Sequence, residues 1–359
     1  MAGKSVSASP AATCKRQLKL IPLLLLCVFL TLMGCMDASN SVQSLNGFRV
    51  DLVHIDSLLP ANTTSTERMK RAVQRSKERL EKLQHSIYSA DKLQDDAQMK
   101  DIQSPVSAGG AEFLMEIAIG TPALSFSAVL DSGSDLVWTK CNPCTDCSTS
   151  VYDPSSSSTY SKLPCQSSLC QDLPHSSCDS DGDCQYLYRY GDKTNTQGIL
   201  SNETFSLSSE SVPQIAFGCA HEIQGFQEVG GLIGFGRGPL SLVSQLAPSV
   251  GNKFSYCLVS RTDSSSQTSP LFIGNTATLN APDVSSTPYI LQGGSKTYYY
   301  LSLEGISVSG QSLDIPAGTF DIQSDGSSGV IIDSGTTLTF LAQSAYDAVK
   351  TAMGSSIRP

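Results

Sequence analysis

Two short segments of the chain carry the residues with the clearest chemical potential. The segment "SAVLDSGSDLVW" spans residues 127–138, and "GVIIDSGTTLTF" spans residues 329–340. Each one runs from apolar residues into Asp-Ser-Gly, then to a hydroxyl residue and back to apolar residues. One such tripeptide is weak evidence, because it arises by chance at roughly one position in two thousand at average composition. Two copies with matched flanks indicate that the chain builds the same turn twice.

The residue types in these turns suit acid–base catalysis by two carboxylates. An apolar strand would bring each aspartate to the end of a buried sheet, and the glycine that follows permits a sharp turn. If the turns face each other, the two carboxylates keep one proton between them, because like charges a few ångströms apart cannot both ionise. One carboxylate can then activate a water while the other protonates a substrate carbonyl. The pattern therefore predicts a hydrolase with an aspartate dyad.

Other chemistries find little support in the sequence. There is no G-x-S-x-G nucleophile motif, no phosphate-binding loop and no dinucleotide fingerprint. The segment "HEIQG", residues 221–225, lacks the second histidine of a zinc-binding H-E-x-x-H motif. Residues 108–359 carry 10 basic and 23 acidic side chains, which argues against nucleic acid as a partner. We expect no cofactor and no metal.

The elements that must position the two turns are mostly strands, so we predict an all-β fold. From residue 111, short apolar runs alternate with clusters of Gly, Ser, Pro and Asn, as in all-β proteins. The predicted strands are "EFLMEIAIG", "FSAVLDSG", "QYLYRYGD", "QIAFGC", "GLIGFG", "KFSYCLV", "PLFIGN", "TYYYLSLEGISV" and "GVIIDSG". Helix signals in this part are limited to "GPLSLVSQL" and "SAYDAVKTAM". The segment at 274–288 is typical of a connection between two β units.

The N-terminus has the order of charge, apolar core and small residues that is typical of a secretory signal peptide, which we place at residues 1–36. Lys15, Arg16 and Lys19 precede the apolar run "LIPLLLLCVFLTLMG", and small residues follow at 34–38. A membrane anchor is the alternative, although the run is short for a transmembrane span. The tetrapeptide "LMGC" also resembles a bacterial lipoprotein cleavage site.

Cysteine usage agrees with export. The chain has 12 cysteines, and nine of them lie between Cys141 and Cys257. In an exported chain this density predicts disulfides. The segment "CNPCTDC", residues 141–147, has zinc binding as its alternative interpretation. Because nine is an odd number, one thiol must lack a partner among these residues.

Residues 37–107 form a separate region. Residues 1–107 together carry 14 basic and 10 acidic side chains, a net charge of +4 that opposes the −13 of the remaining chain. "GFRVDLVHID" alternates apolar and polar residues and predicts a strand. "STERMKRAVQRSKERLEKLQ" predicts a helix capped by Thr66, with Met69, Val73, Leu80 and Leu83 near helical spacing. A solvated surface helix is the simplest interpretation of its seven basic residues.

Taken together, these motifs resemble those of plant pepsin-family aspartic proteases of the nepenthesin type. The likeness runs from about residue 47 to the last residue and rests on "GFRVDLVHID", "IGTP", "VLDSGSDLVWTKCNPC", "YRYGD", "FGC", "GLIGFGRGPLSLVSQL" and "IIDSGTTLTF". It implies a bilobal pepsin-like fold with a prosegment at 37–107, an N-terminal β lobe at 108–285 and a C-terminal β lobe at 286–359. Because the family continues well beyond the second turn, we expect a complete first lobe and an incomplete second lobe.

The resemblance also implies roles for individual residues. Asp131 and Asp333 would be the catalytic dyad, and Ser132 and Ser334 would connect the two turns by hydrogen bonds. The outer carboxylate oxygens would be held by Gly133, Ser134, Gly335 and Thr336. Tyr190 would lie on the flap over the substrate, held by a hydrogen bond from Trp138. The segment 232–234 would pass beneath the first turn.

The family's cysteine pattern implies four disulfides: Cys141–Cys144, Cys147–Cys219, Cys165–Cys184 and Cys170–Cys178. Cys257 would then pair with a residue that this chain does not contain. Two sequons, at Asn62 and Asn202, are candidate N-glycosylation sites.

Two functional hypotheses follow. The first is an acid-acting endopeptidase, made as a zymogen, secreted to the apoplast or sent to the vacuole, acting as a monomer on polypeptide substrates. The basic segment would pair with carboxylates around the cleft and leave when they protonate. The second is a non-catalytic protein on the same fold, such as an inhibitor of glycan-degrading enzymes. Both aspartate turns and the flap tyrosine are present, which favours the enzyme.

Overall fold

A computed structural model describes most of the chain beyond residue 46. The described residues are 47–88 (81–88 by backbone only), 113–145, 147, 151–190, 194–225, 229–259, 268–279, 281–291, 295–324, 326–336 and 338–356. The chain divides into two units, 1–43 and 44–359, and every described residue belongs to the second. The predicted signal peptide and residues 191–193 of the predicted flap lie outside the described residues. No helix within the described ranges is both long and apolar enough to cross a bilayer.

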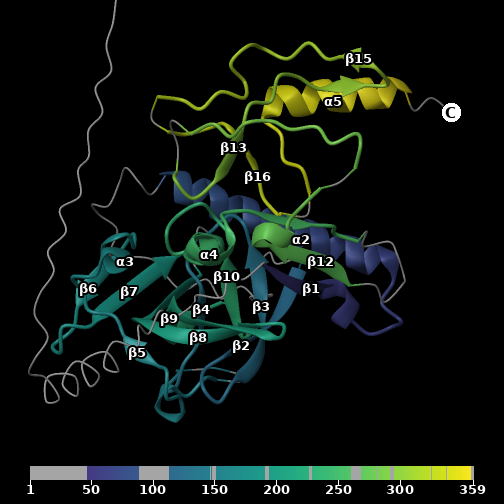
Figure 1. The fold of residues 1–359 in the computed structure, drawn as a ribbon. Coiled ribbons are helices and arrows are strands. Elements are labelled where there is room, and N and C mark those ends of the chain that lie inside the picture. The colour runs from purple at the N-terminus through teal and green to yellow at the C-terminus, as the bar shows by residue number, and fades with distance from the viewer. Residues whose placement is uncertain are drawn as a thin grey trace, which may run out of the picture. The chain divides into compact units, whose positions relative to one another are not determined.

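Strands dominate the described residues, as the sequence predicts (Figure 1). They are β1 Phe48–His54, β2 Phe113–Ile119, β3 Leu124–Asp131, β4 Trp138–Lys140, β5 Ser161–Lys162, β6 Ser176–Cys178, β7 Cys184–Arg189, β8 Asn195–Leu207, β9 Glu210–Gln224, β10 Gly231–Gly234, β11 Phe254–Tyr256, β12 Ser269–Ile273, β13 Tyr299–Leu301, β14 Ser307–Val308, β15 Gln311–Ser312 and β16 Val330–Ile332. The α-helices are α2 Ser65–Tyr88, α3 Ser168–Gln171, α4 Leu242–Val250 and α5 Gln343–Ser356. Short 3-10 helices are η1 Ile55–Leu58, η2 Pro154–Ser156 and η3 Gly274–Thr276.

Twelve of the strands form one sheet. Its main order is β11-β12-β1-β2-β3-β10-β4-β9-β8-β7-β6, with β5 paired to β8. β10 runs parallel to β3, with Gly234 beside Asp131 in the register, and antiparallel to β4. The sheet therefore brings "GLIG" alongside the strand that ends in the first Asp-Ser-Gly turn.

β1 is an interior strand of this sheet although it comes from the predicted prosegment, residues 37–107. It pairs antiparallel with β12 over five residues, from Phe48 opposite Ile273 to Leu52 opposite Ser269. On its other side it pairs with β2. The alternation predicted for this segment is observed, since Phe48, Val50 and Leu52 are buried and the residues between them are exposed. The strand therefore contributes apolar side chains to the same core as the rest of the sheet.

The second Asp-Ser-Gly turn follows a separate, two-stranded sheet. β13 and β16 pair antiparallel, with Tyr299 opposite Ile332. β14 and β15 form another two-stranded ribbon. Asp333 is the residue directly after β16, just as Asp131 is the last residue of β3. Both aspartates thus leave an apolar strand, which is what the sequence pattern predicts.

Sequence and structure differ at two local points. The helix predicted at residues 65–84 is α2, but its capping residue is Thr64 and not Thr66. Thr64 accepts from the Glu67 amide at 3.2 Å, while the Glu67 carboxylate accepts from the Thr64 amide at 2.9 Å. This reciprocal arrangement is a capping box, and it satisfies amides at the start of the helix. The long strand β8 is absent from the strands predicted from sequence, and β9 extends beyond the predicted run "QIAFGC" at both ends.

The predicted disulfide pairing is wrong, although the same eight cysteines are all bonded. The structure pairs Cys141 with Cys219, Cys144 with Cys147, Cys165 with Cys178, and Cys170 with Cys184. β4 and β9 run parallel as neighbours, and the Cys141 amide donates to the Ala220 carbonyl at 2.8 Å. This packing leaves the Cys141 and Cys219 α-carbons 5.2 Å apart, within bonding range. Cys257 is exposed and is the free cysteine of the described residues.

Candidate active site

The two Asp-Ser-Gly turns meet in the structure, and each holds its own carboxylate in the same way. The Gly133 amide donates to Asp131 Oδ1 at 3.0 Å, and the Ser134 hydroxyl donates to Oδ2 at 2.6 Å. In the second turn, the Gly335 amide donates to Asp333 Oδ1 at 3.0 Å and the Thr336 hydroxyl to Oδ2 at 2.6 Å. Asp131 is 1% exposed. The repeated sequence therefore produces a repeated geometry.

The serines of the turns connect them directly. The Ser334 hydroxyl donates to the Ser132 hydroxyl at 3.0 Å, and the Ser334 amide donates to the same oxygen at 2.8 Å. The Ser132 hydroxyl in turn donates to Asp333 Oδ1 at 3.2 Å. Ser132 thus contacts the opposite carboxylate as well as the opposite serine, so that both turns belong to one hydrogen-bond network.

Arg79 of α2 lies on both carboxylates. Its Nε donates to Asp333 Oδ2 at 2.8 Å and its Nη1 to Asp131 Oδ2 at 3.2 Å, while its Nη2 contacts Asp131 Oδ1. Its side chain is 7% exposed. A Cβ at Gly133 would collide with Nη2, so the glycine leaves the room that the guanidinium occupies. One buried cation therefore bridges the two turns.

The buried face of α2 is not the apolar stripe that the sequence suggests. Met69 is 47% exposed, whereas Ala72, Arg75, Ser76 and Arg79 are buried. Arg75 donates to the buried carboxylate of Asp56 at 2.9 Å, just after β1. The helix is thus not a solvated surface helix, because its buried face carries cations that meet buried carboxylates. Spacing alone could not reveal this, since the partners of Arg79 lie 52 and 254 residues away.

The charges of this cluster alter its acid–base behaviour. Burial raises the pKa of Asp333, but the Arg79 guanidinium and the hydrogen bonds from Thr336 and Gly335 outweigh burial and bring that pKa below its usual value. Burial lowers the pKa of Arg79, and the two carboxylates more than reverse this effect. The Asp333 carboxylate and the Arg79 guanidinium are therefore both held in their charged forms while they are in contact.

The predicted flap residues also meet. Trp138 Nε1 donates to the Tyr190 hydroxyl at 2.8 Å, and both side chains are buried. The rings of Tyr188 and Tyr190 lie 5.2 Å apart, and the Asp135 amide donates to the Tyr188 hydroxyl at 3.5 Å. The end of β7 is therefore attached to the segment that follows the first aspartate turn.

Asp135 is a residue of this site that the sequence reasoning missed. Its carboxylate accepts from the Gly238 amide at 2.8 Å and from the Thr297 hydroxyl at 2.6 Å. Burial raises the pKa of Asp135, against the effect of these two donors. The signal was the second acid in "DSGSD", which the paired turn at 333–337 lacks.

Two family models match the chain. The model described as "Xylanase inhibitor N-terminal" matches residues 113–275, and "Xylanase inhibitor C-terminal" matches residues 298–359. Aspartic proteinase nepenthesin-2 of Nepenthes gracilis is 47% identical over 316 residues, which cover 87% of this chain and 68% of the relative. Aspartic proteinase nepenthesin-1 of the same plant is 41% identical and covers 87% and 69%.

This chain belongs to the plant pepsin-like aspartic proteases.

Solved structures of plant pepsin-like proteins share its fold. The crystal structure of EDGP aligns with a TM-score of 0.54 at 23% identity, covering 67% of this chain and 65% of that one. Basic 7S globulin from soybean aligns with a TM-score of 0.52 at 21% identity, covering 70% and 69%. The chain thus spans about two thirds of the length of its relatives. These likenesses support the predicted pepsin-like, mostly-β fold of this family member.

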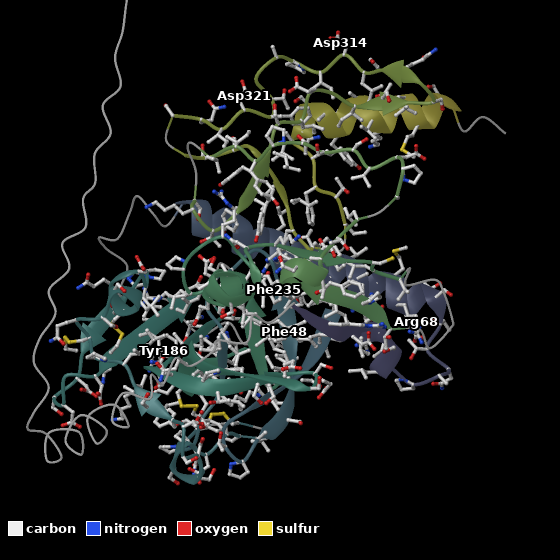
Figure 2. The ribbon with its side chains drawn as sticks, viewed as in Figure 1. Phe48, Arg68, Tyr186, Phe235, Asp314 and Asp321 are labelled. Carbon is white, nitrogen blue, oxygen red and sulfur yellow. A yellow bond between two sulfur atoms is a disulfide. The ribbon has the colours of Figure 1, made fainter. Side chains whose placement is uncertain are left out.

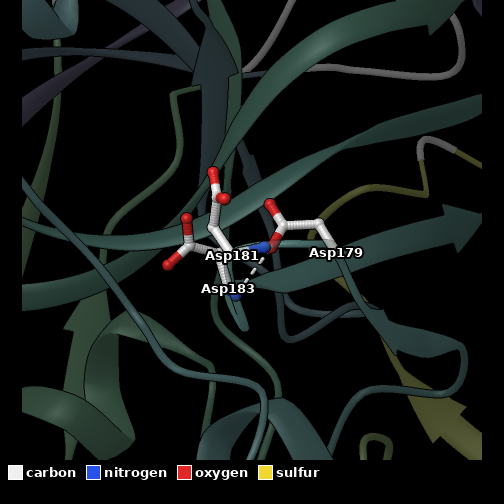
Figure 3. Close-up of side chains that lie close together, drawn as sticks. All are labelled: Asp179, Asp181 and Asp183. Carbon is white, nitrogen blue, oxygen red and sulfur yellow. Dashed lines mark hydrogen bonds between the residues drawn. The ribbon is translucent and has the colours of Figure 1, made fainter.

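Three aspartates outside the paired turns gather on the β6–β7 connection of this plant pepsin-like chain (Figure 3). Asp179 Oδ1 accepts from the amides of Asp181 and Asp183 at 2.9 and 2.8 Å. Lys162 pairs with Asp183 at 2.7 Å and supplies a positive charge to the cluster. The carboxylates of Asp179 and Asp183 thus have protein partners, and the arrangement is explained by the turn.

The two sequons of this family member lie in different environments. Asn62 is exposed in the turn before α2. Asn202 lies inside β8, paired with Ser161 of β5 and Ala216 of β9, and is half-buried. Glycosylation at either residue remains a prediction.

Proposed function

We propose that this chain is an aspartic-type endopeptidase that hydrolyses polypeptides at acid pH through Asp131 and Asp333. The observation that carries the proposal is the pair of equivalent turns, each with an amide and a hydroxyl on its carboxylate, joined through Ser132. The relatives named aspartic proteinases support the same reaction class.

The chemistry follows from the shared site. With the cation absent, two adjacent buried carboxylates keep one proton between them. The ionised carboxylate takes a proton from a water, whose oxygen bonds to the peptide carbonyl carbon, while the protonated carboxyl donates to the carbonyl oxygen. The tetrahedral intermediate then breaks its C–N bond, the nitrogen receives a proton, and a carboxylic acid and an amine leave. Tyr190, held by Trp138, would close over the substrate.

We further propose that residues 37–107 are a prosegment and that the chain is a zymogen. The contact of Arg79 with both aspartates supports this, because a bound guanidinium occupies the position where water and substrate must act. An arginine stays protonated at every relevant pH, so release depends on protonation of the carboxylates. The helix α2 carries seven basic and three acidic side chains, and residues 108–359 carry a net charge of −13, which acts in the same direction.

Export is part of this proposal. The signal-peptide pattern at residues 1–36 and the four disulfides agree with secretion to the apoplast, with the vacuole as the alternative compartment. We expect the mature protein to act as a monomer on polypeptides. The residues assigned to catalysis require neither a metal nor a cofactor.

The name of the matching family models favours one other function, an inhibitor of xylanases. A protein of that kind would bind the glycan-degrading enzyme and would have no need for its aspartates. Binding to a xylanase, together with no peptidase activity, would support this alternative.

The deciding test is cleavage of a denatured protein at about pH 3.5, between the two pKa values typical of an aspartate dyad. We expect activity after acid treatment, abolished by a statine-type inhibitor and reduced at least about a hundredfold in Asp131→Asn. Asp314→Asn, at an exposed aspartate remote from the paired turns, is the matched control and should retain activity (Figure 2). Equal activity of the two variants would contradict the dyad.

A further inference from the structure

Asp135 is surrounded by backbone that is shaped to its carboxylate. The glycines of "GFGRG", residues 234–238, recur at every second position along this segment. A Cβ at Gly236 or Gly238 would collide with the Asp135 carboxylate, and a Cβ at Gly234 would collide with the Asp135 backbone. A side chain at any of these positions would push the segment away from Asp135. The carboxylate therefore accepts the Gly238 amide at close range.

The same segment is bonded to the first aspartate turn by its backbone. The Phe235 amide donates to the Asp131 carbonyl at 2.7 Å, and the Gly236 amide donates to the Ser134 carbonyl at 2.9 Å. Phe235 is fully buried. Any displacement of residues 235–238 would therefore displace the turn that holds Asp131.

The segment is also bonded to residues 297–299 at the start of β13, the strand that pairs with β16. The Arg237 amide donates to the Thr297 carbonyl at 2.9 Å, and its Nη1 donates to the Tyr298 carbonyl at 3.1 Å. The Tyr299 hydroxyl donates to the Phe235 carbonyl at 2.8 Å. Tyr299 begins β13, where it faces Ile332 of β16, one residue before Asp333. A continuous chain of bonds thus connects the two aspartates by a second route.

We infer that Asp135 is a positioning residue, and that a clasp formed by Asp135, residues 235–238 and residues 297–299 sets the placement of Asp131 relative to Asp333. The Asp135–Thr297 hydrogen bond is the side-chain contact of the clasp that reaches directly from the first turn to the second half of the chain. The catalytic consequence rests on the proposed function, whereas the structural consequence does not.

The clasp matters because the dyad tolerates only a small error in the distance between its two carboxylates. Two carboxylates share a proton only while they remain within a few ångströms, and an error of about 1 Å in such a site can cost about a hundredfold in rate. Ser132 and Ser334 connect the turns at their tips through hydroxyls that can rotate. The clasp connects the same turns at their bases through backbone bonds and a buried aromatic side chain, which restrict rotation of one turn against the other.

The test removes one hydroxyl. Thr297→Val deletes the donor to Asp135 and keeps the shape of the side chain, while Thr297→Ser restores the donor. Thr319→Val is the matched control, because the Thr319 hydroxyl also makes one hydrogen bond, to the Pro316 carbonyl at 2.7 Å, but lies outside the clasp. The full chain is used, with amide hydrogen exchange of residues 330–336 and steady-state peptidase kinetics after acid treatment as separate readouts.

We expect Thr297→Val to raise exchange of the Ser334 and Gly335 amides at least about tenfold and to lower kcat about tenfold with little change in KM. Thr297→Ser should restore both, and Thr319→Val should change neither. Unchanged exchange in Thr297→Val would overturn the inference. If the wild-type chain has no peptidase activity, the proposed function fails, and the exchange data still decide the clasp.

Asp135→Asn serves as the second variant if Thr297→Val does not fold. It keeps an oxygen for the Gly238 amide but replaces one acceptor oxygen with an NH2 donor. Raised exchange at residues 333–336 without a change at β14–β15 is the expected result. Uniformly raised exchange across the described strands would mean general destabilisation and would count against a positioning role.

Discussion

The carboxylates of Asp131 and Asp333 accept equivalent hydrogen bonds within their own turns, but Arg79 binds both of them and joins them into one site. Its guanidinium bonds to both carboxylates, and its charge, together with the hydrogen bonds to Asp333, outweighs burial and lowers the pKa of Asp333. A buried ion pair that loses one partner leaves an uncompensated charge, at a cost of several kcal/mol. The dyad and the cation are therefore energetically dependent on each other at the scale of single residues.

Replacement of Arg79 tests this dependence. Arg79→Gln should allow a statine-type inhibitor to bind at about pH 5 at least about tenfold more tightly than in wild type, because the cation no longer competes for the carboxylates. The measurement is calorimetric titration of the unprocessed chain. Arg71→Gln is the control, since Arg71 is exposed on the same helix. Identical affinities for the two variants would show that Arg79 does not block the site.

At the scale of elements, β1 and α2 are held against the rest of the folded structure by different interactions. β1 buries Phe48, Val50 and Leu52 inside the large sheet and bonds to strands on both sides. α2 instead presents buried cations to the carboxylates of Asp56, Asp131 and Asp333. Apolar burial changes little with pH, whereas the ion pairs require ionised carboxylates. We therefore expect α2 to detach before β1 when the pH falls.

The disulfide Cys141–Cys219, which joins the end of β4 to β9, gives a second prediction about these elements. Removing Cys141–Cys219 with the double change Cys141→Ser and Cys219→Ser should lower the free energy of unfolding by about 4 kcal/mol, because the bond closes a loop of 78 residues. Denaturant unfolding under two-state conditions measures the loss. Cys257→Ser, at the exposed free thiol, should leave the stability unchanged. Peptide mapping without reduction should recover Cys141 joined to Cys219; recovery of Cys141 joined to Cys144 would contradict the structure.

At the scale of the whole molecule, acid changes the balance between the basic helix α2 and the acidic residues 108–359. The pKa of Asp333 lies below its ordinary value of 3.8 while Arg79 is bound. A carboxyl group whose folded pKa is lowered stabilises the folded state above its unfolded pKa, and this contribution disappears as the pH falls through the folded value. The Arg79 contact should thus persist through mildly acid pH and weaken below about pH 3.8.

Thermal unfolding at a series of pH values checks this window. We expect wild type to be more stable than Arg79→Gln above about pH 4, with the difference shrinking toward zero as the pH approaches 2. The Arg71→Gln control should follow the wild-type curve throughout. A difference that stays constant over the whole range would mean that Arg79 acts through packing and not through charge. Release of a cut fragment that contains α2, followed in parallel, should begin in the same pH range.

The sequence by itself determined the local features of this protein. The paired turns, the strand before each aspartate and the presence of α2 all follow from short windows, because strand alternation, helix periodicity and turn chemistry act between near neighbours. The contact of Trp138 with Tyr190 and the pepsin-like fold could be expected from the family resemblance that the motifs carry, whereas the residue pattern alone predicted an all-β fold.

Only the tertiary structure decided which distant residues meet. Nothing in the seven basic residues of α2 distinguishes Arg79, because its partners come from strands that fold against the helix from far along the chain. The disulfide partners depend on the parallel pairing of β4 with β9, which cysteine spacing does not encode. The proposed role of Asp135 depends on its hydrogen bonds with Gly238 and Thr297, which lie 103 and 162 residues away in the sequence. Local sequence specifies what each segment can form, and packing between segments selects the charges and thiols that become neighbours.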